Sequence, residues 1–298
     1  MEEMKKCVLC PRMCGADRTS GQTGYCKMPA QVMAARAALH MWEEPCISGE
    51  AGSGTVFFSG CNMGCVFCQN RTIAVGETAK PITIERLAEI FLELQKKGAN
   101  NINLVTPTHY VPQIKKALLS AKKQGLMLPV LYNTSGYERV ETLKGLEGLI
   151  DIYLPDMKYI SPELSAKYSH AGDYFRCAKE AIKEMVRQIP AAEFNERGMM
   201  KRGIIVRHLV LPGCLEDSKR VIRYLYRNFG KHIYISIMNQ YTPMREFPDM
   251  PELNRSLSAE EYEEIIDYAL SLGVDQGFIQ EGETAEESFI PAFDYEGL

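Results

Sequence analysis

The pattern of apolar and polar positions from residue 55 onward predicts strands that alternate with helices. Short apolar runs, typical of strands buried on both faces, occupy residues 55–59, 101–105, 129–132, 149–154, 204–209 and 232–237. Longer segments with helical spacing separate them. This alternation favours parallel strands joined by crossover helices. The sequence therefore predicts an α/β fold, a partial (β/α)6 TIM-like barrel.

Capping residues mark where the helices begin and end. Thr83 can cap a helix that Gly98 ends, and Ser258 with Glu261 forms a capping box that opens the last helix. Further helices are expected at residues 112–125, 173–189 and 217–229, and the last one is expected to stop at Gly273.

The first 45 residues show almost no strand or helix periodicity. They carry Cys7, Cys10, Cys14 and Cys26 and are too few to be stabilised by burial alone. We therefore expect two units: a small cysteine-rich metal-binding unit at residues 1–45 and the barrel at 46–298. The acidic tail, residues 281–298, is expected to be irregular and packed on the barrel, with apolar anchors at Phe289, Ile290, Pro291 and Phe293.

Composition narrows the classes of function. The chain has 298 residues and a net charge of −4, and its basic residues are scattered, which argues against nucleic acid as a partner. No apolar segment is long enough to cross a membrane, and the N-terminus has no signal-peptide pattern, so we expect a cytoplasmic protein. Eight of the ten cysteines precede position 70, which favours metal or cluster binding over disulfides.

The most informative chemistry is the spacing of Cys61, Cys65 and Cys68 on a glycine-bearing loop after a predicted strand. Three thiolates this close can hold one soft metal centre and leave one coordination position open. The structural alternative is a zinc site. Zinc sites usually close with four protein ligands from paired Cys-x-x-Cys knuckles, and a fourth ligand is missing here unless Cys46 returns.

The Cys-x3-Cys-x2-Cys spacing, with Phe67 before the last cysteine, resembles the signature of the radical S-adenosylmethionine (SAM) superfamily. The resemblance implies a 4Fe-4S cluster bound by Cys61, Cys65 and Cys68, with SAM chelating the fourth iron and Phe67 beside the cofactor. It also implies that reductive cleavage of SAM gives a 5′-deoxyadenosyl radical that abstracts hydrogen from an unreactive carbon. The expected enzyme is thus a radical SAM oxidoreductase.

Three further motifs at predicted strand ends are similar to those of the enzymes that activate glycyl radical enzymes, such as pyruvate formate-lyase activating enzyme. They are residues 133–137 (Asn-Thr-Ser-Gly-Tyr), residues 156–158 (Asp-Met-Lys) and residues 207–213 (Arg-His-Leu-Val-Leu-Pro-Gly). The resemblance implies that Asn133, Thr134 and Asp156 bind a monovalent cation or the cofactor carboxylate. It also implies that Lys158 contacts cofactor or substrate, as the catalytic residue, and that Arg207 faces the cofactor.

Each motif also has a structural explanation. Asn-Thr-Ser-Gly is a good turn sequence, and Asp156 with Lys158 can be a surface pair. The chain departs from the superfamily after the second predicted strand, where Thr106-Pro107-Thr108-His109 replaces the usual Gly-Gly-Glu. Strand-end carbonyls, the hydroxyls of Thr106 or Thr108, or His109 are expected to receive the cofactor ammonium instead.

The N-terminal spacing Cys7-x2-Cys10-x3-Cys14-x11-Cys26 makes a complete four-thiolate site, for zinc or for an auxiliary iron–sulfur cluster. This feature and the missing Gly-Gly-Glu resemble an uncharacterised subgroup of activating-enzyme homologues. The other cysteines and histidines are expected to be inert or structural: Cys46, Cys177, Cys214, His40, His170 and His232.

Three functions follow from these patterns. The first is a radical SAM enzyme that abstracts hydrogen from a glycyl radical enzyme or another protein substrate, with a flavodoxin or ferredoxin as electron donor. The second is a radical SAM enzyme that acts on a small metabolite or a peptide. The third is a metal-stabilised barrel that binds a partner without redox chemistry. The segments 191–202 and 240–256, which would shape specificity, carry no motif that identifies a substrate.

Overall fold

The computed structural model describes residues 2–280 and 291–298. Its strands are β1 (Val32–His40), β2 (Ser53–Phe58), β3 (Lys80–Ile82), β4 (Ile102–Val105), β5 (Val130–Thr134), β6 (Ile152–Pro155), β7 (Glu193–Phe194), β8 (Met200–Leu209), β9 (Tyr234–Met238) and β10 (Gly277–Ile279). The α-helices are α1 (Pro45–Ser48), α2 (Arg71–Ala74), α3 (Ile84–Lys96), α4 (Val111–Lys123), α5 (Val140–Lys144), α6 (Pro162–Ser169), α7 (Tyr174–Gln188), α8 (Leu215–Phe229) and α9 (Ala259–Ser271).

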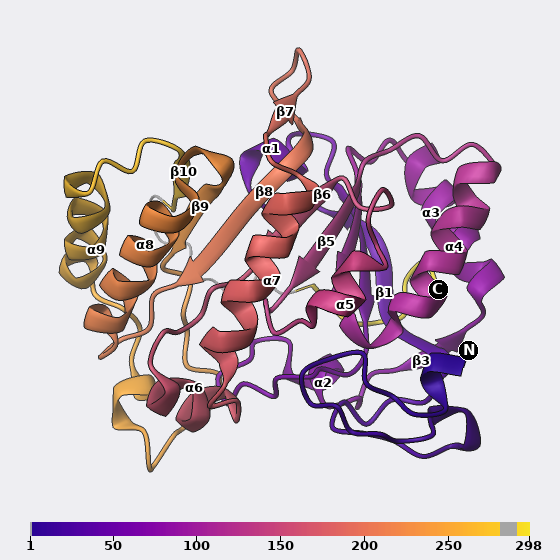
Figure 1. The fold of residues 1–298 in the computed structure, drawn as a ribbon, viewed down its shortest axis with the longest axis horizontal. Coiled ribbons are helices and arrows are strands. Elements are labelled where there is room, and N and C mark those ends of the chain that lie inside the picture. The colour runs from indigo at the N-terminus through magenta and orange to yellow at the C-terminus, as the bar shows by residue number, and fades with distance from the viewer. Residues whose placement is uncertain (1, 281–290) are drawn as a thin grey trace.

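Within the described residues, the strands join in one sheet of order β10-β9-β8-β6-β5-β4-β2-β1-β3, with β7 paired to β8. From β2 to β10 the neighbours along this order are parallel, while β1 pairs antiparallel with both β2 and β3. The long helices flank this sheet, α3 and α4 on one side of the view and α8 and α9 on the other (Figure 1). The mixed α/β fold with a central sheet confirms the predicted class.

The six predicted strands correspond to β2, β4, β5, β6, β8 and β9, with shifts of a few residues at their ends. Four of the helix predictions correspond to α3, α4, α7 and α8. The capping box of α9 is present, since Ser258 and the Glu261 side chain each bond the other's backbone N–H. The sequence pattern failed to predict β1, β3, β7 and β10. The predicted boundary at residue 45 follows β1, which pairs along its length with β2 in the main sheet.

The segment between β1 and β2 closes one end of the barrel. Cys46 and Ile47 of α1 pack against inward-facing apolar side chains of β5, β6 and β8, including Leu131 and Ile205. On the outer side, Tyr132 and Tyr153 belong to the main core shared with the helices. The alternation along β5 therefore sends Leu131 and Asn133 into the barrel and Tyr132 and Thr134 toward the helices.

The cysteine-rich N-terminus lies below the sheet, near the ends of β1 and β3 (Figure 1). It contains two short 3-10 turns, Glu2–Met4 and Arg18–Ser20, before β1. In the C-terminal tail, Phe293 packs edge-on against Phe57 of β2, as expected for an anchor, whereas Phe289 and Ile290 lie outside the described residues. Among the described helices, none has the length and apolar composition needed to span a membrane.

A candidate cluster loop at the mouth of a polar barrel cavity

Backbone geometry shapes the loop that carries Cys61, Cys65 and Cys68. Gly60 and Gly64 have φ angles of 87° and 71°, in the left-handed region that favours glycine. The Gly60 N–H donates to the Ile73 carbonyl at 2.8 Å, and a side chain at Gly60 would collide with Met28. The chain can therefore turn sharply after β2 and present three cysteines within one short loop.

The three loop thiols are partly buried and close enough to repel one another as thiolates. Burial raises the pKa of Cys65 and raises that of Cys68 to about 12, and the neighbouring loop cysteines add to both shifts. Lys158 opposes these shifts, and the Ser169 hydroxyl donates to Cys65 Sγ at 3.0 Å. Without a metal Cys65 and Cys68 keep their protons, so a soft cation is the natural partner for the thiols of this loop.

The donor set fits a cluster better than a single ion. In the described part of the chain, no three His, Cys, Asp or Glu side chains converge as the ligands of one metal ion do. A zinc ion would draw its thiolates to about 2.3 Å from one point. An iron–sulfur cluster is larger and takes its thiolates on separate irons. Three cysteines on one short loop, with no fourth ligand converging on them among the described residues, suit the second arrangement.

The N-terminal segment contacts residues 61–68, the cluster loop, through hydrogen bonds to its backbone carbonyls. The Arg12 guanidinium donates to the carbonyls of Asn62 at 2.9 Å and Met63 at 3.2 Å, and to that of His170 at 2.6 Å. Tyr25 donates its hydroxyl to the same Met63 carbonyl at 3.0 Å, and the Arg12 guanidinium lies 3.8 Å from the centre of its ring. These contacts join the cysteine-rich segment directly to the cluster loop.

The four N-terminal cysteines are neighbours but do not surround one point. Cys7 and Cys26 are buried, Cys10 is partly buried and Cys14 is exposed. Burial raises the pKa of Cys10 to about 12, and the nearby Cys26 and Cys14 raise it further. Arg18, which is buried, lies 3.8 Å from Cys7 Sγ through one guanidinium nitrogen. The predicted metal or auxiliary cluster at these residues stays a prediction.

At the strand ends, four of the predicted site residues form one network. The parallel register puts Asp156 opposite Arg207, and Arg207 opposite Ser236. Arg207 donates to Asp156 at 3.1 Å and to the Asn133 side-chain oxygen at 2.6 Å, while Lys158 donates to Asp156 at 2.7 Å. Asn133, Asp156, Lys158 and Arg207 are therefore brought together, although they come from three different strand ends.

Charge pairing sets the ionisation of this network. Burial would raise the pKa of Asp156, but Lys158 and Arg207 hold it below its usual value. Burial would lower the pKa of Lys158 and of Arg207, but the negative charge of Asp156 helps to raise both above their usual values. Cys65 also raises the pKa of Lys158, and Glu43 also raises that of Arg207. All three groups are thus charged and held in place before any ligand arrives.

Glu43 and Glu44, which the sequence analysis missed, complete the site from the segment that closes the barrel. Glu43 accepts from Arg207 at 3.1 Å, from Asn103 at 2.8 Å and from Asn133 at 3.1 Å. A Glu-Glu pair before a proline is ordinary in a loop, and nothing in its spacing marks it as part of a site. Only the folding of residues 41–52 under the barrel brings it there.

Thr108 and Thr134 point away from the barrel interior. Both hydroxyls donate to Oε1 of the buried Glu138, Thr108 at 2.5 Å and Thr134 at a still shorter distance. Their hydroxyls are therefore engaged within the protein, which leaves strand-end carbonyls and the Thr106 hydroxyl as candidate acceptors for the cofactor ammonium. Thr106 has a φ angle of 57°, unusual for a threonine, and its N–H donates to the Asn133 carbonyl at 2.9 Å.

Of the aromatic and histidine residues considered above, Phe67 and His109 are buried, whereas His40 lines the cavity. Phe67 is buried, with its ring edge-on to Tyr241 at 6.2 Å between centres. His109 is buried and bonded to the Ser59 carbonyl at 2.8 Å, and burial lowers its pKa to about 3. His109 therefore stays neutral and structural. Burial also lowers the pKa of His40, which lines the cavity, to about 4.

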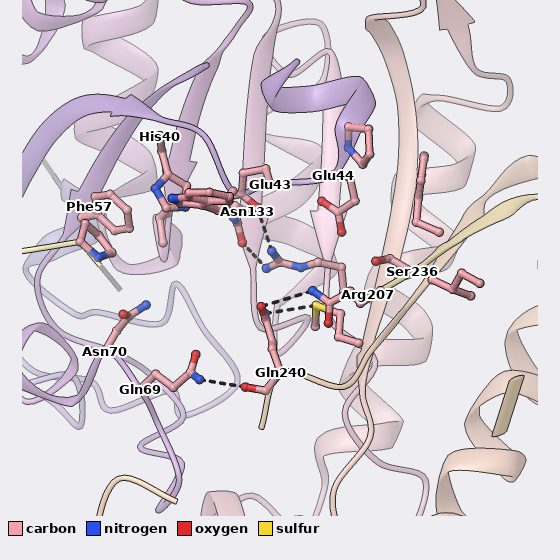
Figure 2. A pocket seen from close by; sticks show the side chains of 18 residues that line it. His40, Glu43, Glu44, Phe57, Gln69, Asn70, Asn133, Arg207, Ser236 and Gln240 are labelled. Atoms are coloured by element: carbon pink, nitrogen blue, oxygen red, sulfur yellow. Dashed lines mark hydrogen bonds and ion pairs between the residues drawn. The ribbon is translucent and has the colours of Figure 1, made fainter. Parts of the chain in front are cut away.

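A cavity of about 330 Å³ lies inside the barrel. Its walls include Phe57 of β2, Val105 of β4 and Ser236 of β9, and it is also lined by Gln69 and Asn70, which directly follow the last cysteine of the cluster loop. Side chains from strands this far apart meet at one cavity only if the sheet is curved. Figure 2 shows Gln69, Asn70 and Gln240 at one end of this cavity, with His40, Glu43 and Glu44 toward the other.

Comparisons with known proteins agree with this arrangement. Residues 55–200 match the model of the Radical SAM superfamily. An uncharacterized protein of Methanocaldococcus jannaschii is 27% identical over 281 residues, which are 91% of this chain and 76% of that protein.

Solved structures resemble the fold. The FeFe-hydrogenase maturase HydG from Carboxydothermus hydrogenoformans matches with a TM-score of 0.51 and 12% identity, over 77% of this chain and 54% of that one. SuiB of Streptococcus suis, solved with its precursor peptide SuiA, matches with a TM-score of 0.49 and 14% identity, over 74% of this chain and 46% of that one. The chain thus covers about half the length of these two proteins. The part of the chain similar to the Radical SAM superfamily is thus residues 55–200, with the cysteine loop near its start.

Proposed function

We propose that this protein is a hydrogen-abstracting radical SAM enzyme whose reaction takes place in the barrel cavity. One observation carries the proposal: the loop with Cys61, Cys65 and Cys68 leads directly into a cavity whose polar residues are ordered in advance. When bound, a 4Fe-4S cluster and SAM would supply a carbon radical able to remove hydrogen from an unactivated position. The chain's own residues hold, orient and shield these groups.

The strand-end network suits the binding of a zwitterionic cofactor. Lys158 and Arg207 are positive groups near the cluster loop, fit for a carboxylate, and the carbonyls at the end of β4 can accept from an ammonium. Because Asp156 already pairs with Lys158 and Arg207, we infer that it holds these two cations and that they, with Asn133, bind the cofactor carboxylate; a monovalent-cation site is less favoured.

Anaerobic reconstitution with iron and sulfide tests the proposal. We expect a cluster whose low-temperature electron paramagnetic resonance signal changes on adding SAM, and methionine with 5′-deoxyadenosine on reduction. Replacing Cys61, Cys65 and Cys68 together with Ala should abolish both. Cys214→Ala is the matched control, because Cys214 is also a buried thiol but lies outside the loop. Protein that holds only zinc would refute the proposal and support a non-catalytic binding barrel.

The cavity favours a small substrate. About 330 Å³ is at the lower end of the range for small-molecule sites, and α1 closes the barrel behind it. Because Asn133 and Arg207 line the same cavity, the cofactor would share this volume, so the part of the substrate that enters would have to be small: a metabolite or one side chain of a peptide. The resemblance to glycyl radical activases offers a protein loop as the alternative, and a flavodoxin or ferredoxin as electron donor. Capture of a partner protein by the reconstituted enzyme supports the alternative, whereas changed metabolite ratios in extracts support the small substrate.

A further inference from the structure

One acidic group in the cavity lacks a counter-charge. Glu44 is only 8% exposed, and in the described part of the chain its Oε2 atom has no hydrogen-bond partner. Glu44 precedes α1, yet its side chain does not cap that helix. Its backbone carbonyl accepts from the N–H groups of Ile47 and Ser48, which fixes the main chain. The carboxylate is therefore held at the cavity wall with one oxygen unused (Figure 2).

The ion pairs around Glu44 show that an ionised Glu44 would have no counter-charge. Arg207 is within electrostatic range, but its guanidinium donates to Glu43, Asp156 and Asn133. Lys158 pairs with Asp156. Two positive groups thus match Glu43 and Asp156, and within the described residues Glu44 has no ion pair. Burial raises the pKa of Glu44, Arg207 opposes this shift and Glu43 adds to it, so without a ligand the group favours its protonated form. A cationic ligand would supply the charge that lets Glu44 ionise, and its place in a binding cavity indicates such a ligand.

On the basis of the proposed function, we propose that the cavity takes a substrate bearing a primary ammonium group, which binds Glu44 at the end of the cavity away from the cluster loop. The Ser236 hydroxyl bonds the same carboxylate, so one oxygen remains. A guanidinium prefers two free carboxylate oxygens, whereas an ammonium is a point donor that needs one. Binding there leaves the rest of the substrate pointing toward Gln69 and Asn70.

The cofactor itself is the first competing occupant. A cofactor ammonium bound at Glu44 would leave the carbonyls at the end of β4 unused. A simple metal cation is the second, although Glu44 Oε2 and the Ser236 hydroxyl make a poor ligand set for one. Both occupants can be separated from a substrate ammonium by direct binding measurements.

The test is isothermal titration calorimetry of anaerobically reconstituted protein, with and without SAM. The probes are n-butylammonium, n-butylguanidinium, n-butanol and butyrate. Trp42 lines the cavity, is 61% exposed and is the sole tryptophan of the sequence, so its emission locates the binding event. We expect butylammonium to bind and shift this emission, butylguanidinium to bind more weakly, and the neutral and anionic probes not to bind.

Glu44→Gln keeps the shape of the side chain and removes its charge. We expect this variant to weaken butylammonium binding by about tenfold or more, as loss of one charged hydrogen-bond partner does. Glu50→Gln is the matched control, because Glu50 is exposed in the same segment, and it should bind as the original protein does. If Glu44→Gln fails to fold, the preference of the unaltered protein for butylammonium over butanol still decides the question.

Three results would overturn this inference: equal binding of butanol and butylammonium, full binding by Glu44→Gln, or displacement of butylammonium by SAM or by sodium at equal concentration. These outcomes are independent of the proposed function. Protein that cleaves SAM but does not bind butylammonium keeps the function and loses this site. Protein that binds butylammonium but forms no cluster keeps the site and loses the function.

Discussion

At the scale of single residues, Glu138 shows how burial controls a group that ties two strand ends together. Its carboxyl accepts from the hydroxyls of Thr108, after β4, and Thr134, in β5. Burial raises its pKa from 4.5 to about 7, although the hydroxyl donors act in the opposite direction. Its Oε2 atom is buried without a partner among the described residues. The group therefore favours its protonated form in the folded protein.

This shift predicts how stability depends on pH. Below pH 4.5 Glu138 holds its proton in both the folded and the unfolded chain. Between pH 4.5 and about pH 7 it holds the proton only in the folded chain. The free energy of unfolding therefore falls as the pH rises through this range. The full cost above that range is about 3 kcal/mol. Glu138→Gln cannot ionise, so its stability relative to the original protein should increase by up to that amount between about pH 5 and about pH 8.

Urea unfolding at the two pH values measures this difference. Glu50→Gln serves as the control, because it removes an exposed carboxyl, and it should show little change with pH. A Glu138→Gln variant with the same relative stability at both pH values would contradict the assignment.

The site residues also show what the sequence could predict. Cys61, Asn133, Asp156 and Arg207 follow or end apolar strand runs, so their place in the chain predicts the edge of the sheet on which they meet. Glu44 and Glu138 have no such pattern. Glu44 reaches the cavity, and Glu138 reaches the strand ends behind it, through tertiary contacts of loops that neighbours in the sequence do not specify.

At the scale of elements, too, the sequence pattern predicts what depends on local residues and misses what depends on tertiary contacts. Parallel strands buried on both faces are continuous apolar runs, so β2, β4, β5, β6, β8 and β9 could be predicted. In contrast, β1 contains four alanines within Val32–His40 and lacks alternation, so its pattern does not distinguish a strand. Its strand form depends on pairing with β2 and β3, which is a property of the fold.

Helix caps are local and could be predicted well. Ser258 accepts from the Glu261 N–H at 3.2 Å, and the Glu261 side chain accepts from the Ser258 N–H at 3.0 Å. Ser258→Ala should therefore lower the free energy of unfolding by about 1 kcal/mol. Chemical denaturation measures it, with Ser256→Ala as the control, since no side-chain bond of Ser256 caps this helix. Equal losses in the two variants would show that the cap contributes nothing.

The cluster loop is an element that another segment holds in place. Arg12 donates to four carbonyls around it, those of Asn62, Met63, Ser169 and His170. Arg12→Ala should lower the free energy of unfolding by about 1.5–3 kcal/mol, speed hydrogen exchange of residues 61–68, and reduce the iron retained after reconstitution. Arg12→Lys keeps the charge but not the planar donor fork, so an intermediate effect is expected. Iron content and exchange like those of the original protein in Arg12→Ala would contradict this role.

At the scale of the whole molecule, the cysteine-rich segment is attached to the barrel at several points. Arg139 donates to the Val8 carbonyl at 2.6 Å, Thr142 to that of Leu9 at 2.7 Å, and Arg18 to that of His109 at 2.6 Å. Residues 2–30 thus contact the loops after β4 and β5 as well as the cluster loop. Any change in the order of this segment should reach the candidate site.

A metal or auxiliary cluster at Cys7, Cys10, Cys14 and Cys26 would then stabilise the whole molecule. We expect Cys10→Ser to lose one bound metal or cluster per chain, lower the thermal midpoint, and increase hydrogen exchange both in residues 2–30 and in the loop 61–68. Cys46→Ser is the matched control, because that thiol is buried under the barrel away from both sets. Absorption and iron content of the protein separate zinc from an iron–sulfur cluster. Unchanged metal content in Cys10→Ser would show that these cysteines hold no metal, and the contacts of Arg12, Arg18 and Arg139 alone would then have to order the segment.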